Sequence, residues 1–156
     1  MNTHAASLSC VEKYNLYTQA QIDWQNDSAD VAIKLLPDHI ERINQYKNVQ
    51  LIAIERRKLA VSIAFDNFPE KVSHWGSINQ WIDLSPELES ELIRRSPEFE
   101  ALTSEYQQLI SKPAQGANND FHQTFRKAVL SDPDFLKLMS DFDAKNREVN
   151  SLSCDA

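Results

Sequence analysis

The sequence contains very little glycine: Gly76 and Gly116 are the only two among its 156 residues. Tight turns between strands and loops that wrap phosphates both rely on glycine, because glycine tolerates backbone angles that other residues avoid. A chain this poor in glycine cannot turn a β-sheet repeatedly and carries no glycine-rich nucleotide loop. The scarcity predicts an all-α protein with long helices, separated by six prolines.

Cysteine and long apolar runs are scarce as well. The only cysteines are Cys10 and Cys154, they are not spaced as a CxxC pair, and no basic-then-apolar leader opens the chain. No apolar run approaches the roughly 18 residues that a membrane span needs. These absences predict a cytoplasmic protein without a membrane partner, whose two thiols are reduced. A bond joining the two ends of the chain is the alternative.

Positive charge is the third shortage. Sixteen lysines and arginines stand against 23 aspartates and glutamates, which gives a net charge of −7. Binding to a nucleic-acid backbone requires a basic footprint, so the balance argues against nucleic acid as a partner. It favours a basic protein partner.

The pattern that remains predicts one domain over residues 1–156: an irregular bundle of about six to eight helices. Apolar residues at helical spacing indicate a first helix over 7–25, a break at 26–28, and a short helix through Leu36. The longest helix is expected at about 38–67, in the centre of the bundle. Residues 111–119 are expected to form a loop, and residues 1–6 and 151–156 to be frayed ends.

Two local patterns bear on this division. Residues 49–65 are rich in β-branched side chains and could instead form a hairpin, although the connector Glu55-Arg56-Arg57-Lys58 has no turn residue. The phrases Ser85-Pro86-Glu87, Ser96-Pro97-Glu98 and Asp132-Pro133-Asp134 each place a capping oxygen before proline and an acid. They predict three helix starts.

Residues 51–61, Leu-Ile-Ala-Ile-Glu-Arg-Arg-Lys-Leu-Ala-Val, resemble the long first helix of the all-helical chorismate mutases. That family binds a dicarboxylate substrate with arginines and a lysine, and Arg56 matches its helix-centre arginine. The position of the family's upstream arginine falls on His39, and that of its downstream lysine on Asn67. The resemblance therefore favours a helix over a hairpin here and does not assign the chain to the family.

No catalytic or metal-binding motif is present. The sequence has no G-x-S-x-G and no H-E-x-x-H, and its Glu/His pairs lack the three-residue spacing of di-iron bundles. We therefore predict no catalytic residues, no cofactor and no metal, and lean against an enzyme. A helical metalloprotein using His39, His74 or His122 is one alternative. Trp75 and Trp81 are expected to form a core corner, with a ligand pocket as their alternative.

The charged residues supply the two remaining hypotheses. Residues 83–105 carry seven acids and two arginines, and predict an acidic docking face. Its expected partner-binding residues are Glu87, Glu91, Glu98 and Glu105. We thus predict a non-catalytic interaction or regulatory protein whose partner is a basic protein or, in a homodimer, a second copy. The alternative is a small-anion-binding enzyme or sensor with a pocket around Arg56 and Arg57, because arginine matches carboxylates and phosphates.

Overall fold

The computed structural model describes residues 8–114 and 120–156, and within them the protein is all-helical. The described residues form six α-helices and three short 3₁₀ turns, and their only β-type pairing is two isolated bridges. The α-helices are α1 (Cys10–Leu35), α2 (Ile40–Asn67), α3 (Pro86–Arg95), α4 (Pro97–Ser111), α5 (Phe121–Leu130) and α6 (Pro133–Ser151). The turns are η1 (Pro37–His39), η2 (Pro69–Lys71) and η3 (Ile78–Gln80).

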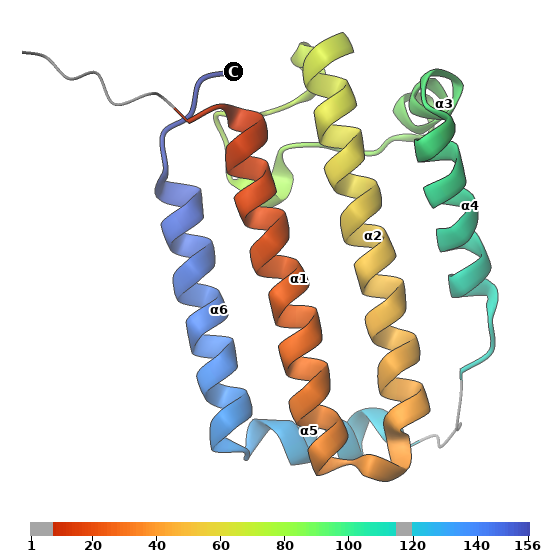
Figure 1. Cartoon of the computed structure of the whole chain (residues 1–156), viewed down its shortest axis with the longest axis vertical. Helices are drawn as coiled ribbons and strands as arrows, with labels where there is room; N and C mark the ends of the chain where they lie inside the picture. The colour runs from red at the N-terminus through yellow and green to blue at the C-terminus, as the bar shows by residue number, and fades with distance from the viewer. Residues whose placement is uncertain (1–7, 115–119) are drawn as a thin grey trace, which may run out of the picture.

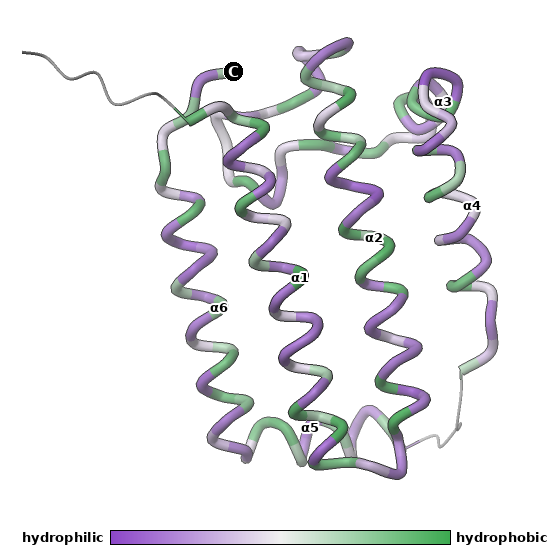
Figure 2. The backbone as a smooth tube through the Cα atoms, in the orientation of Figure 1, coloured by the Kyte–Doolittle hydropathy of each residue, from purple (hydrophilic) through white to green (hydrophobic). Residues whose placement is uncertain are grey.

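Four of the helices stand side by side in a row, in the order α6, α1, α2, α4, with neighbours antiparallel (Figure 1). Helix α5 crosses the row at one end, and the short helix α3 sits beside the start of α4 at the other end. Hydrophobic residues recur along each long helix (Figure 2). Each long helix of the row therefore contributes hydrophobic residues to the packing between neighbours.

Helix α2 confirms the predicted long helix and excludes the hairpin at 49–65. It lies inside the row, between α1 and α4. Between Ile43 and Ala60, however, none of its residues is fully buried. An inner position in a row gives α2 neighbours on two sides only, so its middle is half-exposed rather than enclosed as the sequence led us to expect.

The three proline-led helix starts are confirmed. The side chains of Ser85, Ser96 and Asp132 accept hydrogen bonds from the backbone N–H groups of Leu88, Phe99 and Phe135, at the first turns of α3, α4 and α6. Proline follows each cap, where its missing N–H costs nothing. Local sequence alone therefore fixes where these three helices begin.

The predicted break at residues 26–28 is wrong, because α1 runs without interruption from Cys10 to Leu35. The Ser28 hydroxyl donates to the Trp24 carbonyl one turn back at 2.5 Å, so this polar side chain bonds within the helix. No glycine or proline stands there to end it, and the chain turns only at Pro37.

Residues 68–85 contain no α-helix. The turns η2 and η3 are joined by extended chain, with a bridge between Val72 and Ile82 and a hydrogen bond of 2.7 Å from the Ser73 N–H to the Trp81 carbonyl. Burial explains why this segment is extended rather than helical, since Val72, Trp81 and Ile82 are at most 2% exposed. The segment delivers these three side chains to the core.

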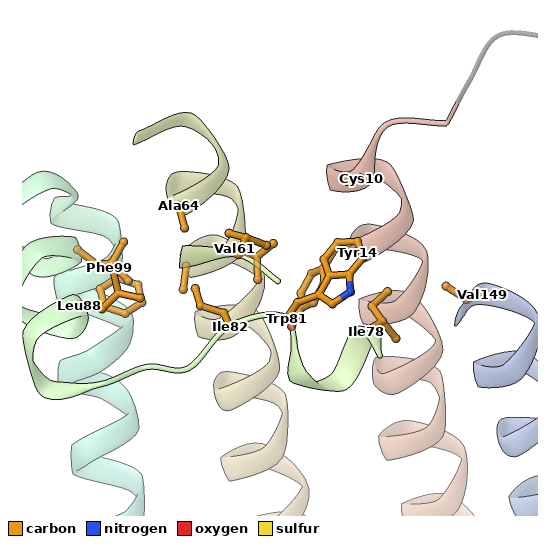
Figure 3. Packing of buried hydrophobic residues seen from close by; sticks show 13 residues of the cluster. Cys10, Tyr14, Val61, Ala64, Ile78, Trp81, Ile82, Leu88, Phe99 and Val149 are labelled. Carbon is orange, nitrogen blue, oxygen red and sulfur yellow. The ribbon is translucent and has the colours of Figure 1, made fainter. Parts of the chain in front are cut away.

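The core consists of two clusters. The larger one surrounds Trp81, which packs against Tyr14 of α1 and lies near Val61 and Ile82 (Figure 3). The smaller one gathers at the opposite end, where α5 crosses the row. Its buried members are Ala29, Ala32, Ile43, Phe121, Val129 and Phe135.

The two ends of the described chain meet, and one prediction about them fails. Cys10 and Cys154 form a disulfide, so the expected free thiols are wrong. The backbone of Asp155 pairs with Leu8 and Cys10 through two hydrogen bonds of 2.9 Å, and α6 ends at Ser151. The expected fraying of 151–156 stays a prediction. The expected frayed end at 1–6, and residues 115–119 of the expected loop, lie outside the described residues.

Candidate functional site

Helices α3 and α4 place the predicted acidic residues at the edge of the row. Helix α4 stands at the end of the row opposite α6, with α3 beside its start (Figure 1). Glu87, Glu98 and Glu105 are exposed. Glu98 and Glu105 are seven residues apart, two turns of one helix, so they share a face of α4. Helix α4 contains no lysine or arginine, so this face carries uncompensated negative charge.

Glu91, the fourth predicted residue, is placed differently. It is half-buried on α3 and forms ion pairs with Arg94 and Arg95, the second at 3.8 Å. Glu91 therefore pairs with both arginines of the acidic stretch and offsets one of their two positive charges. Glu87, Glu98 and Glu105 form no ion pair with any described residue. We call these three residues the acidic edge.

Arg56 is engaged inside the protein. Its Nη2 lies 2.7 Å from Glu89 Oε2, and its Nε donates to the Thr103 hydroxyl at 2.9 Å. The guanidinium carbon stands 5.0 Å from the ring centroid of Phe99 and 5.7 Å from that of Tyr106. Arg56 thus fastens α2 to both α3 and α4, through an ion pair, a hydrogen bond and two cation–π contacts.

The Arg57 side chain lies on a different side of α2 from that of Arg56. Its Nη2 donates to the Ile82 carbonyl at 2.6 Å, and its charge acts on the phenols of Tyr14 and Tyr17. Burial outweighs that charge and raises the pKa of Tyr14 to about 12. Arg56 and Arg57 therefore both serve internal contacts, and neither lines the pockets that border Trp24 or Trp75.

The fold places His39 and His122 beside the same ring, Phe121, and His74 at the other end of α2. His39 contacts Phe121 near α5, whereas His74 contacts Phe65 at the other end of α2. His122 lies against its neighbour Phe121. Within residues 8–114 and 120–156, no three His, Cys, Asp or Glu side chains lie close enough to hold a metal ion. The metalloprotein alternative gains no donor set from this arrangement.

The two tryptophans divide between core and surface. Trp81 is 1% exposed and its Nε1–H donates to the Gly76 carbonyl at 3.1 Å, as expected of a core corner. Trp75 is 74% exposed. Beside Trp81 lies Lys13, which is 5% exposed and donates to the Asn150 carbonyl at 3.0 Å. Burial lowers the pKa of Lys13, a residue that the sequence gave no reason to single out.

The sequence also gave no warning of a cavity of about 330 Å³ where α5 crosses the row. Its walls come from α1, α2, α5 and the start of α6 and include several aromatic side chains. The lining residues lie more than 100 positions apart, from Trp24 to Phe135. No local pattern connects residues so distant, so only the tertiary arrangement identifies this site.

Comparison with known proteins adds no relative: the chain matches no protein-family model, no curated protein and no solved structure. The local resemblance of residues 51–61 to chorismate mutases therefore has no counterpart at the level of a family. Among the described residues, no helix is long and apolar enough to cross a membrane.

Proposed function

We propose that this protein is a non-catalytic interaction protein that binds a basic protein surface through the acidic edge on α3 and α4. One observation carries the proposal: Glu87, Glu98 and Glu105 are exposed and have no ion-pair partner among the described residues, and the nearby Arg94 and Arg95 pair with Glu91 instead. Charge complementarity speeds encounter and selects partners, so such a surface favours a lysine- or arginine-rich partner.

A second copy of the chain is a poorer occupant of this surface. In a two-fold dimer the same patch faces itself, so the acidic edge would meet an identical acidic edge. Like charges placed opposite one another oppose association. A homodimer, the other partner that the sequence suggested, would have to use a different face.

Two other expectations weaken. The small-anion alternative needs a free guanidinium, and Arg56 and Arg57 are both used in internal contacts. The expected cytoplasmic location is opposed by the Cys10–Cys154 disulfide, because such bonds persist mainly in oxidising compartments.

The proposal is tested by affinity capture from the native cells with three matched proteins. The first is the natural chain. The second is Glu87→Gln/Glu98→Gln/Glu105→Gln, and the third is Asp30→Asn/Asp66→Asn/Asp143→Asn, which removes the same charge from exposed residues elsewhere. Glu87 and Glu98 also lie in the first turns of α3 and α4, where their negative charge stabilises the positive end of the helix dipole. Melting curves must therefore first show that both variants fold.

The expected result is a stoichiometric basic partner that the natural chain and the Asp variant retain. The Glu variant should bind the purified partner about tenfold more weakly at low salt, since three lost charge interactions of roughly 0.5 kcal/mol each amount to about that factor. A partner that binds both variants equally, or binding that does not weaken with added salt, would overturn the proposal.

A further inference from the structure

The cavity at the α5 end of the row has the composition of a ligand site. Five aromatic side chains contribute to its wall: Trp24, Tyr46, Phe121, Phe125 and Phe135. Small-molecule sites are typically concave, of about 300–1,000 Å³, and apolar with a few polar groups. The volume of about 330 Å³ falls in this range.

The aromatic walls are held in place by one another. The Trp24 and Phe135 ring centroids lie 5.6 Å apart at an interplanar angle of 64°, and Phe125 meets Phe135 edge-on at 6.4 Å. The small side chains of Ala29 and Ala32 on α1 leave the space between these rings open. Since an apolar cavity of about 150 Å³ is enough to bind benzene, this one has room for two fused rings.

The cavity lining includes one lysine and one histidine but no acidic residue. Lys47 on α2 is half-buried and forms no ion pair with any described residue. The exposed His122 on α5 also belongs to the lining. No described residue of the lining is acidic, although the chain has a net charge of −7. Arg42 adds positive charge nearby, because its guanidinium carbon lies 5.1 Å from the Phe121 ring centroid.

We propose that this cavity binds a small planar aromatic carboxylate. The ring system inserts among Trp24, Phe121 and Phe135, where it replaces water against apolar walls. The carboxylate stays at the partly exposed rim and pairs with the ammonium group of Lys47. This site lies apart from the acidic edge and does not depend on the proposed protein partner.

The test uses 2-naphthoate and its uncharged analogue 2-naphthalenemethanol as probes. Isothermal titration calorimetry measures their affinities, and NMR follows the indole N–H signals of Trp24, Trp75 and Trp81. We expect one molecule of 2-naphthoate to bind at least tenfold more tightly than the alcohol. The Trp24 signal should shift, while that of Trp75, which lies near Cys154 and outside the cavity, should stay fixed.

Three variants separate the parts of the claim. Lys47→Gln should weaken 2-naphthoate about tenfold and leave the alcohol unchanged. Lys34→Gln, on an exposed part of α1 outside the cavity, should change neither. Ala29→Leu, which fills the cavity, should abolish binding of both probes. A melting curve checks that this variant folds. If Ala29→Leu unfolds, Lys47→Gln still tests the proposal. Absence of binding at millimolar probe, equal affinity for both probes, or shifts at Trp75 without Trp24 would each overturn the proposal.

Discussion

Cys10 and Cys154 are joined by a disulfide although they lie 144 positions apart in the sequence. Cys10 begins α1, and Cys154 follows α6, the neighbouring helix of the row. The bond therefore closes α6 against α1 at the end of the row opposite α5, where the backbone of Asp155 also pairs with Leu8 and Cys10.

Removing this bond should destabilise the protein strongly. In the chain-entropy account, closing a loop of this length lowers the entropy of the unfolded chain enough to contribute about 4–5 kcal/mol. The double variant Cys10→Ser/Cys154→Ser should lose about that much unfolding free energy in urea titrations. Thiol titration of the denatured natural protein should find no free thiol, and two reactive thiols would contradict the account.

Arg56 should be the most costly of the charged residues on α2 to remove. Arg56→Met ends its contacts with Glu89, Thr103 and two rings, and leaves the half-buried Glu89 unpaired. We expect a loss of about 2–3 kcal/mol in urea unfolding. Arg94→Met breaks only an exposed pair with Glu91 and should cost less than about 1 kcal/mol. Equal losses in the two variants would refute the tethering role.

Replacing Trp81 should cost much more stability than replacing Trp75. Trp81 is 1% exposed and contacts Tyr14 and Phe65, so Trp81→Ala should cost about 3–5 kcal/mol or prevent folding. Trp75 is 74% exposed, and Trp75→Ala should change stability by no more than about 0.5 kcal/mol. Thermal and urea unfolding of both variants provide the comparison, and a marked loss in the Trp75 variant would show that this side chain is packed.

Tyr14 should make stability fall at alkaline pH. Burial raises its pKa to about 12 in the folded protein, against the ordinary value of 10.0. Between these values the unfolded chain releases the phenolic proton while the folded chain keeps it. The contribution is therefore complete below about pH 10 and is lost as the pH rises through 12, a fall of about 2–3 kcal/mol.

The control for this prediction is Tyr14→Phe, compared with the natural chain by urea unfolding at a series of pH values from 9 to 12. The variant should show a shallower fall. Part of the slope should remain, because burial also raises the pKa of Tyr17. Lys13 acts in the opposite direction, since its lowered pKa favours folding as the pH rises toward 10.5. Identical slopes in the two proteins would exclude Tyr14 as the cause.

Local signals were sufficient for much of the fold. The scarcity of glycine, the long apolar periodicity of 38–67 and the three proline-led caps correctly predicted an all-α chain and the starts of α3, α4 and α6. The errors arose where tertiary contacts decide. Residues 26–28 were predicted as a break, but α1 continues through them and the Ser28 hydroxyl bonds within the helix. The disulfide between Cys10 and Cys154 was likewise not expected.

The site was less accessible to sequence reasoning. Charge counting found the acidic stretch, but it could not separate the exposed Glu98 from Glu91, which is tied to two arginines. The meeting of Cys10 with Cys154 depends on how α6 docks on α1, and the cavity depends on where α5 crosses. Both arise from packing between segments far apart in the chain, for which no spacing rule exists.

The most direct test of the acidic edge is hydrogen–deuterium exchange of this protein with and without its captured partner. Our account predicts slower exchange in α3 and α4, residues 86–111, and unchanged exchange in α6 at the far end of the row. Slower exchange in α6, together with unchanged exchange in α3 and α4, would contradict the central claim. The partner would then bind a surface that does not include the acidic edge.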